Sequence, residues 1–293
     1  MKWGYALIWA GQLLRGDADP LYAKLKFLAD HRLYTTGIGI GELEAMEEGY
    51  RGKLFEYLAG REQALTLIPH ADFCNASIDV ARREVDHAIA CVGKYAAGTK
   101  APICHVGVAR LHRFMREPSL AWQMERLAEV LPPLAQACRE AGAPLSIENH
   151  GDYYCSDLVE LCRAVRDLYI FLDTGNPFLV GERPLPAAEA AAPYVIGGHW
   201  KDHRVCPVAN SGPLRFEIGA SVIGEGDVPL REIYDVLKAH TPNFEKVVME
   251  IELIPPSFSG NDPVEAVERS VAFCRSLDAQ PSETRVRKGD IHE

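Results

Sequence analysis

Four side chains that can bind a metal ion end successive apolar segments in the second half of the chain. Glu148 follows the run LSI, Asp173 ends YIFLD, His199 ends YVIGGH and Glu250 ends VVME. A buried ionised carboxylate is strongly destabilising unless a cation or hydrogen bonds compensate it. Singly, each acid is more often a salt bridge or helix cap, and the histidine a satisfied core group. Four in succession favour one shared divalent cation.

The types of these ligands indicate which ion would bind. Three carboxylates and one imidazole make a mostly oxygen shell. Such a shell suits the hard or borderline ions Mn²⁺ and Mg²⁺ best, with Co²⁺ and Zn²⁺ also possible. The sequence therefore predicts one divalent metal ion, provided that the fold brings the four segments together.

A barrel of parallel strands would do this. Strand-like apolar runs alternate with amphipathic helical segments eight times in the 293 residues. This predicts a (β/α)₈ TIM barrel, an α/β fold whose strands all end around one mouth. An open doubly wound sheet would spread the four residues apart, and no G-x-G-x-x-G follows the first strand. The predicted strands are 4–10, 33–40, 64–70, 101–108, 144–150, 168–176, 195–200 and 246–253.

The domain organisation follows from this count. We expect a single barrel domain over residues 1–278 and a polar C-terminal tail over 279–293. The helix predicted over 119–141 contains two adjacent prolines, at 132 and 133, where a kink or break is expected. A long glycine-bearing loop is predicted over 208–227, and its last residue, Asp227, is expected to cap the next helix.

Composition narrows the class of partner. The chain is 47% hydrophobic and 25% charged, as in ordinary globular proteins, and its net charge is −10. An acidic chain disfavours nucleic acid as a partner, because binding phosphates needs a basic face, so a small polar substrate fits better.

The eight cysteines include no C-x-x-C pair. Reduced thiols in a cytoplasmic protein are therefore favoured over a disulfide framework. Gln12 and Arg15 interrupt the apolar N-terminal stretch, which we interpret as the first strand and not a signal peptide, and we expect no membrane association.

Taken in order, the motifs IENH, LDTGN, GGHWKDH, IGEGDVPL and VVMEIE resemble the xylose isomerase-like TIM-barrel superfamily. The likeness is greatest to its small sugar isomerases and epimerases and its keto-inositol dehydratases, and the superfamily is related to AP endonuclease family 2. It covers essentially the whole barrel. The resemblance implies that Glu148, Asp173, His199 and Glu250 hold the metal ion, and that a sugar carbonyl and its neighbouring hydroxyl complete the coordination. It also suggests a homo-oligomer.

The chemistry expected of such a site begins with loss of a proton next to a carbonyl. A divalent ion bound to a ketose carbonyl and the adjacent hydroxyl stabilises the resulting enediolate. The resemblance to ketose epimerases suggests Glu148 and Glu250 as the catalytic base and acid on opposite faces of the substrate. Moving the proton to the next carbon gives isomerisation, and returning it to the other face gives epimerisation. A metal-dependent isomerase or epimerase of a keto-sugar or polyol is the leading hypothesis.

Three other functions stay open. Losing a β-substituent from the same intermediate would make the protein a lyase, either a keto-inositol or dehydroshikimate dehydratase or an enzyme that cleaves 3-oxo-glycosides. An apolar pocket for an aglycone would favour the last of these, with candidate lining residues Trp122, Phe178, Trp200 and Phe258. A non-catalytic sugar-binding barrel is less favoured, because it has no use for two opposed glutamates. An AP-endonuclease-like nuclease would need several metal ions.

Further polar residues near the strand ends are candidate substrate contacts. His150 lies two positions after Glu148, and Lys201 and Arg204 lie in the charged run after His199. In the resembled family a Lys-Asp pair in that run lies near the site. For all three residues, a place in a solvated loop is the competing interpretation.

Three more candidates bear on the choice between branches. His70 and His105 end the third and fourth predicted strands, where nuclease-like members use histidines in a multi-metal cluster. Asn176 stands three positions after Asp173, where the nuclease and ketose-epimerase patterns usually have histidine. A cluster would then lack a ligand, which argues against a nuclease and favours His70, His105 and Asn176 as substrate-binding residues. For both histidines, burial in the core or a loop is the competing interpretation.

Overall fold

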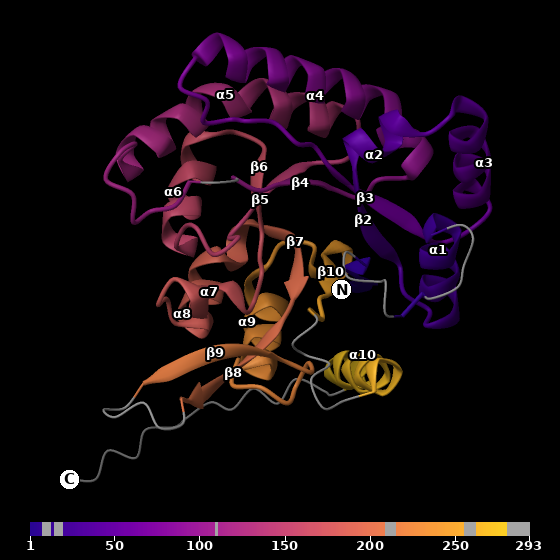
Figure 1. The fold of residues 1–293 in the computed structure, drawn as a ribbon, viewed down its shortest axis with the longest axis vertical. Coiled ribbons are helices and arrows are strands. Elements are labelled where there is room, and N and C mark those ends of the chain that lie inside the picture. Colours follow the sequence, from indigo (N-terminus) through magenta and orange to yellow (C-terminus); the bar gives the residue numbers. More distant parts are fainter. Residues whose placement is uncertain (8–12, 15–19, 109–110, 209–214, 255–261, 280–293) are drawn as a thin grey trace.

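The computed structural model describes residues 1–7, 13–14, 20–108, 111–208, 215–254 and 262–279. Within these ranges eight parallel strands form one sheet in the order β1-β10-β7-β6-β5-β4-β3-β2 (Figure 1). The N–H of Tyr34 donates to the carbonyl of Trp3 at 2.7 Å, which joins the two ends of that order. The predicted (β/α)₈ barrel is confirmed. Its strands are β1 (Lys2–Tyr5), β2 (Thr35–Gly39), β3 (Ala64–Ile68), β4 (Cys104–Val106), β5 (Leu145–Glu148), β6 (Leu168–Phe171), β7 (Val195–Trp200) and β10 (Val248–Ile251).

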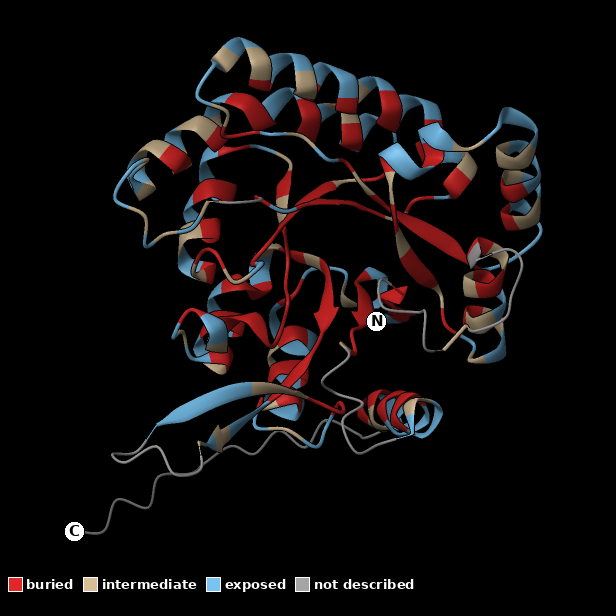
Figure 2. Ribbon diagram, in the orientation of Figure 1, coloured by how far each residue is buried: buried red, intermediate tan, exposed pale blue. Residues whose placement is uncertain are grey.

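Helices cover the outside of the barrel and turn one buried face toward it (Figures 1 and 2). In α5, Leu127, Leu131, Leu134 and Cys138 recur at helical spacing and are fully buried, as their periodicity predicts. Short 3₁₀ turns occupy Ala192–Tyr194 and Phe244–Lys246. The helices are α1 (Pro20–Asp30), α2 (Ile40–Ala45), α3 (Glu48–Ala59), α4 (Ile78–Thr99), α5 (Leu120–Glu140), α6 (Cys155–Ala164), α7 (Asn176–Leu179), α8 (Pro184–Ala191), α9 (Leu230–His240) and α10 (Pro263–Ala279).

The prolines of α5 do not break the helix. The helix runs without interruption from Leu120 to Glu140, with Pro132 and Pro133 inside it. Both prolines are exposed on the outer face. The carbonyl groups that lose a partner can there bind water. The alternative of a break is therefore wrong, whereas the kink stays a prediction.

The segment after β7 is a β-hairpin for much of its length, not the predicted loop. Strand β8 (Asp202–Pro207) pairs antiparallel with β9 (Phe216–Ser221). The Asp227 carboxylate accepts the N–H of Val205 in this hairpin at 2.8 Å, and α9 begins only at Leu230. Asp227 thus fixes the hairpin and does not cap the helix, because it lies too far before the first turn.

A buried carboxylate fastens the hairpin to the loop before α9. Asp202 accepts the N–H groups of Gly224, Gly226 and Val228 at 2.9, 2.9 and 3.2 Å. A Cβ atom on Gly226 would lie 2.2 Å from Asp202 Oδ1, so only glycine fits there. The IGEGD motif is therefore explained by a turn around Asp202, immediately beyond the end of β7.

Other predictions concern the whole chain. All eight cysteines are free, and all but Cys206 are buried, which agrees with the prediction of reduced thiols. Among the described residues no helix has the length and apolarity needed to span a bilayer. The predicted polar tail lies outside the described residues except for Ala279, which ends α10.

Candidate metal centre at the barrel mouth

Strand register directs the predicted ligands to one place. His199 of β7 pairs with Glu250 of β10, so both side chains project from the same face of the sheet. Glu148 pairs with Phe171 of β6, and Asp173, two residues beyond Phe171, faces the same side. Because these four strands are neighbours, their carboxyl ends bring the side chains to the barrel mouth.

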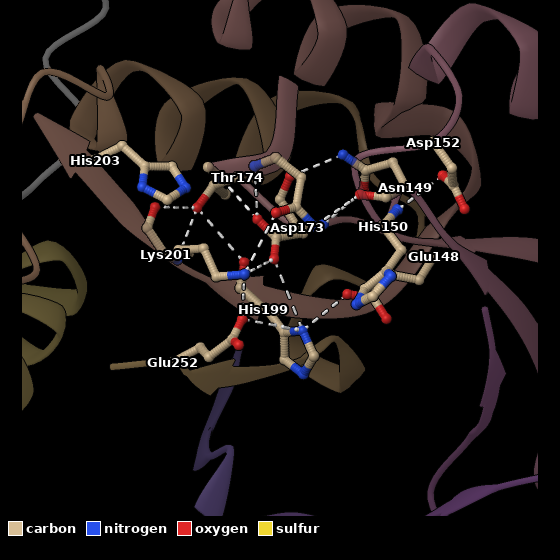
Figure 3. Close-up of polar contacts among 12 residues, drawn as sticks. Glu148, Asn149, His150, Asp152, Asp173, Thr174, His199, Lys201, His203 and Glu252 are labelled. Atoms are coloured by element: carbon tan, nitrogen blue, oxygen red, sulfur yellow. Dashed lines mark hydrogen bonds and ion pairs between the residues drawn. The ribbon is translucent and has the colours of Figure 1, made fainter. Parts of the chain in front are cut away.

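Three of the four predicted ligands come together there (Figure 3). One ligand atom of each of Glu148, Asp173 and His199 lies within 4.8 Å of the other two. The Nδ1 atom of His199 is 3.0 Å from Glu148 Oε1 and 3.8 Å from Asp173 Oδ2. All three side chains are buried, Asp173 completely. This is the arrangement that the sequence predicted for residues sharing one cation.

Two side chains hold the backbone of this group in place. The Asn149 amide donates to the carbonyl of Asp173 at 2.9 Å and accepts its N–H at 2.7 Å. The Thr174 hydroxyl donates to the carbonyl of Lys201 at 2.7 Å and accepts its N–H at 2.9 Å. The strand ends after β6 and β7 are thus fixed to their neighbours, which preorganises the ligands.

The Asp173 carboxylate is oriented by its own loop. Its Oδ1 accepts the N–H groups of Gly175 and Asn176 at 2.8 and 2.9 Å. Its Oδ2 is fully buried, makes no hydrogen bond of ordinary geometry, and faces Lys201 Nζ at 2.9 Å as an ion pair. One oxygen is therefore committed to the fold, and the other faces the cluster.

Glu252 joins the cluster although the sequence interpretation did not include it. Its Oε2 lies 2.6 Å from Lys201 Nζ and 3.5 Å from His199 Nδ1 (Figure 3). Glu252 follows Glu250 by two positions, so it continues the same inward face of β10 one step nearer the mouth. The pattern E-x-E at the end of VVMEIE was the signal for it.

Glu250 is the fourth predicted ligand. It is buried, one carboxylate oxygen has no hydrogen-bond partner, and the other approaches Gly37 of β2. Burial raises the pKa of its carboxyl, an effect partly offset by His199 and by a hydrogen bond from Thr66. The three-residue group with metal-ligand spacing does not include it. Its role as fourth ligand stays a prediction, supported by its register with His199.

The charges of the cluster are strongly coupled. Burial disfavours the charged form of His199, but the Glu148 and Glu252 carboxylates outweigh it and raise the pKa of His199 to about 10. Burial likewise opposes ionisation of Glu148, but His199 lowers the pKa of that carboxyl to about 2. Asp173 and Glu252 raise the pKa of Lys201 despite its burial.

These residues fit a divalent cation. Three carboxylates, Glu148, Asp173 and Glu252, face two groups that carry a proton in the absence of a metal ion, His199 and Lys201. Glu250 Oε1 is in addition a buried carboxylate oxygen with no hydrogen-bond partner, and a cation bound beside His199 would satisfy it. The ion would replace the proton on His199, which releases Nδ1 or Nε2 as a ligand.

Metal affinity is expected to rise with pH for this reason. In the metal-free protein the pKa of His199 is raised from its ordinary value of 6.5 to about 10. The protonated His199 therefore stabilises the folded state. This contribution is fully present below about pH 6.5 and is lost as pH rises through about 10. Metal must displace that proton. We expect the dissociation constant for Mn²⁺ to fall about tenfold per pH unit across neutral pH. Calorimetric titration in buffers of different ionisation enthalpy measures the released proton directly. An affinity that does not change with pH would show that His199 is not protonated before the ion binds.

The three histidines predicted to contact substrate differ in their burial. His105 is buried, stacks on Phe171 at 4.1 Å between ring centroids, and has an Nδ1 atom without a partner. Burial lowers the pKa of His105 to about 3, so it is neutral. His70 is exposed and lines a cavity of about 340 Å³ beside the ends of β3 and β4. His150 is exposed next to Glu148 (Figure 3).

The other three contacts are engaged within the protein. Asn176 donates to the carbonyl of Asn149 at 2.9 Å and accepts from Lys201 Nζ at 3.3 Å. Lys201 belongs to the cluster itself. Arg204 is exposed on β8 and donates to the carbonyl of Glu225. Lys201 and Asn176 therefore lie at the site as part of its ion-pair network, whereas the one polar contact described for Arg204 is with the loop before α9.

The family of the chain is now clear. Residues 50–277 match the family model described as xylose isomerase-like TIM barrel, and the chain belongs to that family. No curated protein matches the chain in sequence.

Solved structures share the fold over nearly the full length. D-psicose 3-epimerase with D-tagatose from Clostridium cellulolyticum H10 has a TM-score of 0.71 at 15% identity, over 95% of this chain and 99% of that one. The IOLI protein with a binding zinc atom has a TM-score of 0.70 at 14% identity, over 94% and 98%. The probable 3-DHS dehydratase AsbF from Bacillus anthracis has a TM-score of 0.65 at 13% identity, over 94% and 99%. At these identities the similarity establishes the fold alone.

Proposed function

We propose that the protein is a divalent-metal-dependent isomerase or epimerase that acts on a keto-sugar or related polyol. The observation that carries the proposal is the convergence of Glu148, Asp173 and His199 within 4.8 Å at the barrel mouth. The family assignment supports an enzyme, and the similarity in fold to an epimerase solved with D-tagatose supports a sugar as substrate. Mn²⁺ or Mg²⁺ is proposed as the ion, because the donor set is mostly oxygen.

Glu148, Asp173 and His199 would hold the ion, with Glu250 as the proposed fourth ligand. Once bound, it would supply positive charge that stabilises the negative charge developing on the carbonyl and hydroxyl oxygens of a substrate. The chain itself supplies a second positive charge at this site. This charge is the Lys201 ammonium, which pairs with Asp173 and Glu252.

The two glutamates are suited to opposite ends of a proton transfer. The Glu148 carboxylate, which is ionised in the metal-free protein because His199 lowers its pKa to about 2, would take the proton from a carbon next to a carbonyl. Burial raises the pKa of the Glu250 carboxyl, so Glu250 takes up a proton more readily than Glu148 and would return one to the substrate. A pair of carboxyl groups whose surroundings push their pKa values apart is the usual arrangement for acid–base catalysis. Neutral His105, whose buried Nδ1 has no hydrogen-bond partner, is proposed to bind a substrate hydroxyl.

Dehydration is the second candidate, and the similarity in fold to a probable dehydratase favours it over glycoside cleavage and over phosphodiester cleavage. The pocket expected of a 3-oxo-glycoside lyase gains no support. Trp200 is completely buried and packs edge-to-face on Trp3 at 5.5 Å. Trp122 lies beneath Arg126 on α5, and Phe258 lies outside the described residues. The acidic net charge of −10 continues to argue against a nuclease.

Metal content is the first test. We expect about one Mn²⁺ or Mg²⁺ to bind per wild-type chain at the mouth and to be lost in the Glu148→Gln, Glu250→Gln double variant, because removal of two anionic ligands leaves the shell incomplete. Elemental analysis after dialysis measures both. A protein that binds no divalent ion on titration would refute the proposal. Several zinc ions that all disappear with the two glutamates would instead favour a nuclease-type cluster.

The reaction itself is tested by NMR with keto-sugars in deuterated water. Exchange of the α-proton with a change of configuration identifies an epimerase, and transfer to the next carbon identifies an isomerase. An unsaturated product identifies a dehydratase. The control is the same incubation after chelation of the metal, in which we expect no exchange above the uncatalysed rate.

A further inference from the structure

Three potential metal ligands also gather on the outside of the barrel. His87 and Cys91 are four residues apart on α4, so their side chains lie on one face of that helix, one turn apart. Glu44 comes from α2, the six-residue helix that follows β2. The two helices pack against each other on the same side of the barrel (Figure 1). None of these residues belongs to the mouth cluster.

The distances among the three suit a small tetrahedral ion. His87 Nε2 lies 3.1 Å from Glu44 Oε2 and 3.7 Å from Cys91 Sγ, and all three ligand atoms are within 4.8 Å of one another. Tetrahedral Zn²⁺, with Zn–S of about 2.3 Å and Zn–N of about 2.0 Å, separates sulfur from nitrogen by about 3.5 Å. The thiol and the imidazole therefore already have nearly the required spacing, and only small side-chain shifts would admit an ion.

Two of the three side chains are exposed and the third is buried, so an ion can reach the cluster from solvent. The side chains of His87 and Glu44 are 59% and 38% exposed, whereas Cys91 is buried beneath them. An ion would meet the carboxylate and the imidazole first and bind the thiolate at the base. The carboxylate and the thiolate together neutralise a charge of two, and water can complete the tetrahedron.

We propose that Glu44, His87 and Cys91 form a second metal site, which selects Zn²⁺. A thiolate ligand favours Zn²⁺ over Mg²⁺ and Mn²⁺, the opposite of the preference expected from the oxygen-rich mouth. Without an ion, Glu44 and His87 are only an exposed pair, which contributes little to stability, and the Cys91 thiol makes a hydrogen bond to His87 at 3.7 Å. With an ion, α2 is fastened to α4 by bonds from both helices.

Cobalt substitution tests the proposal, because Co²⁺ bound to a thiolate gives an intense near-ultraviolet charge-transfer band. We expect the band in the wild-type protein and its loss in Cys91→Ser. The residues of the mouth cluster include no cysteine, so that site cannot produce the signal. Cys206→Ser is the control, since Cys206 is the cysteine that is not buried and lies outside this cluster, and it should keep the band.

The double variant Glu44→Gln, His87→Gln controls for a folding defect in Cys91→Ser, because these two side chains are exposed whereas Cys91 is buried. We expect it to bind Zn²⁺ at this site at least about tenfold more weakly, the loss that even outer-shell substitutions cause. Equilibrium dialysis of Zn²⁺ against the Glu148→Gln protein, with excess Mg²⁺ present, isolates this site from the mouth. Absence of the cobalt band at saturation, or its persistence in Cys91→Ser, would overturn the proposal.

Discussion

Replacing Glu148 by Gln is expected to lower the rate of substrate α-proton exchange about 10²- to 10⁴-fold, the range for removal of a general acid or base. The amide keeps the size of the side chain but can neither accept a proton from carbon nor supply negative charge to an ion. It also removes the carboxylate that lies 3.0 Å from His199 Nδ1. The pKa of His199 should therefore fall from about 10, because Glu148 is the largest of the influences that raise it.

The measurement is deuterium incorporation into the best substrate found in the NMR screen, at saturating Mn²⁺. Glu160→Gln is the matched control, since Glu160 lies on α6 with its side chain 71% exposed and pairs only with Arg163 among its described ion pairs. That variant should retain full activity. A Glu148→Gln protein that exchanges the proton at the wild-type rate would remove Glu148 from the catalytic pair and leave Glu250 or Glu252 to be tested as the base.

Much of this arrangement could be predicted from the sequence, because burial leaves a pattern in the chain. A parallel strand covered on both faces is a continuous apolar run, so a charged residue at its end is conspicuous. Glu148, Asp173 and His199 were found in that way, and the structure brings them together. The register that aligns Asp173 and His199 follows from the barrel, which the eightfold alternation of strands and helices predicts.

Side-chain direction was harder to predict than strand position. Glu250 lies in β10 and Glu252 directly follows that strand on the same side, and the sequence cannot decide which carboxylate reaches His199. In the structure Glu252 does, at 3.5 Å. Arg204 presents the same difficulty. It follows His199 closely in the chain, but the hairpin directs it to the carbonyl of Glu225.

The hairpin was missed because no hydrophobic pattern specifies it. Most of the β8 and β9 positions are exposed or half-buried, so the alternation that marks an ordinary antiparallel strand is weak. What holds the hairpin in place is a set of backbone N–H groups bound to two carboxylates, Asp202 and Asp227. Such contacts depend on turns that close only in the folded chain.

Lys201→Met is expected to destabilise the metal-free protein by about 3–5 kcal/mol, the range for removing one partner of a buried ion pair. The ammonium lies 2.9 Å from Asp173 Oδ2 and 2.6 Å from Glu252 Oε2, and both carboxylates are buried. Methionine fills a volume similar to that of lysine, so the loss of stability would come from removing the charge and not from creating a cavity. Urea unfolding in the presence of a chelator measures the free energy of unfolding. An unchanged m-value would show that the variant and the wild-type protein expose the same surface area on unfolding, so that their free energies can be compared.

The same variant separates the charge of Lys201 from that of the ion. Adding Mn²⁺ should reduce the difference between Lys201→Met and wild type, because a divalent cation beside Asp173 compensates the carboxylate that lost its partner. Lys26→Met is the matched control. Lys26 pairs with Asp30 on the surface of α1 with side chains 73% and 55% exposed, and loss of such an i,i+4 pair costs only about 0.3–0.5 kcal/mol. Equal, small losses in the two variants would mean that the buried carboxylates find other partners, and a loss at Lys201 that Mn²⁺ leaves unchanged would place the ion away from Asp173.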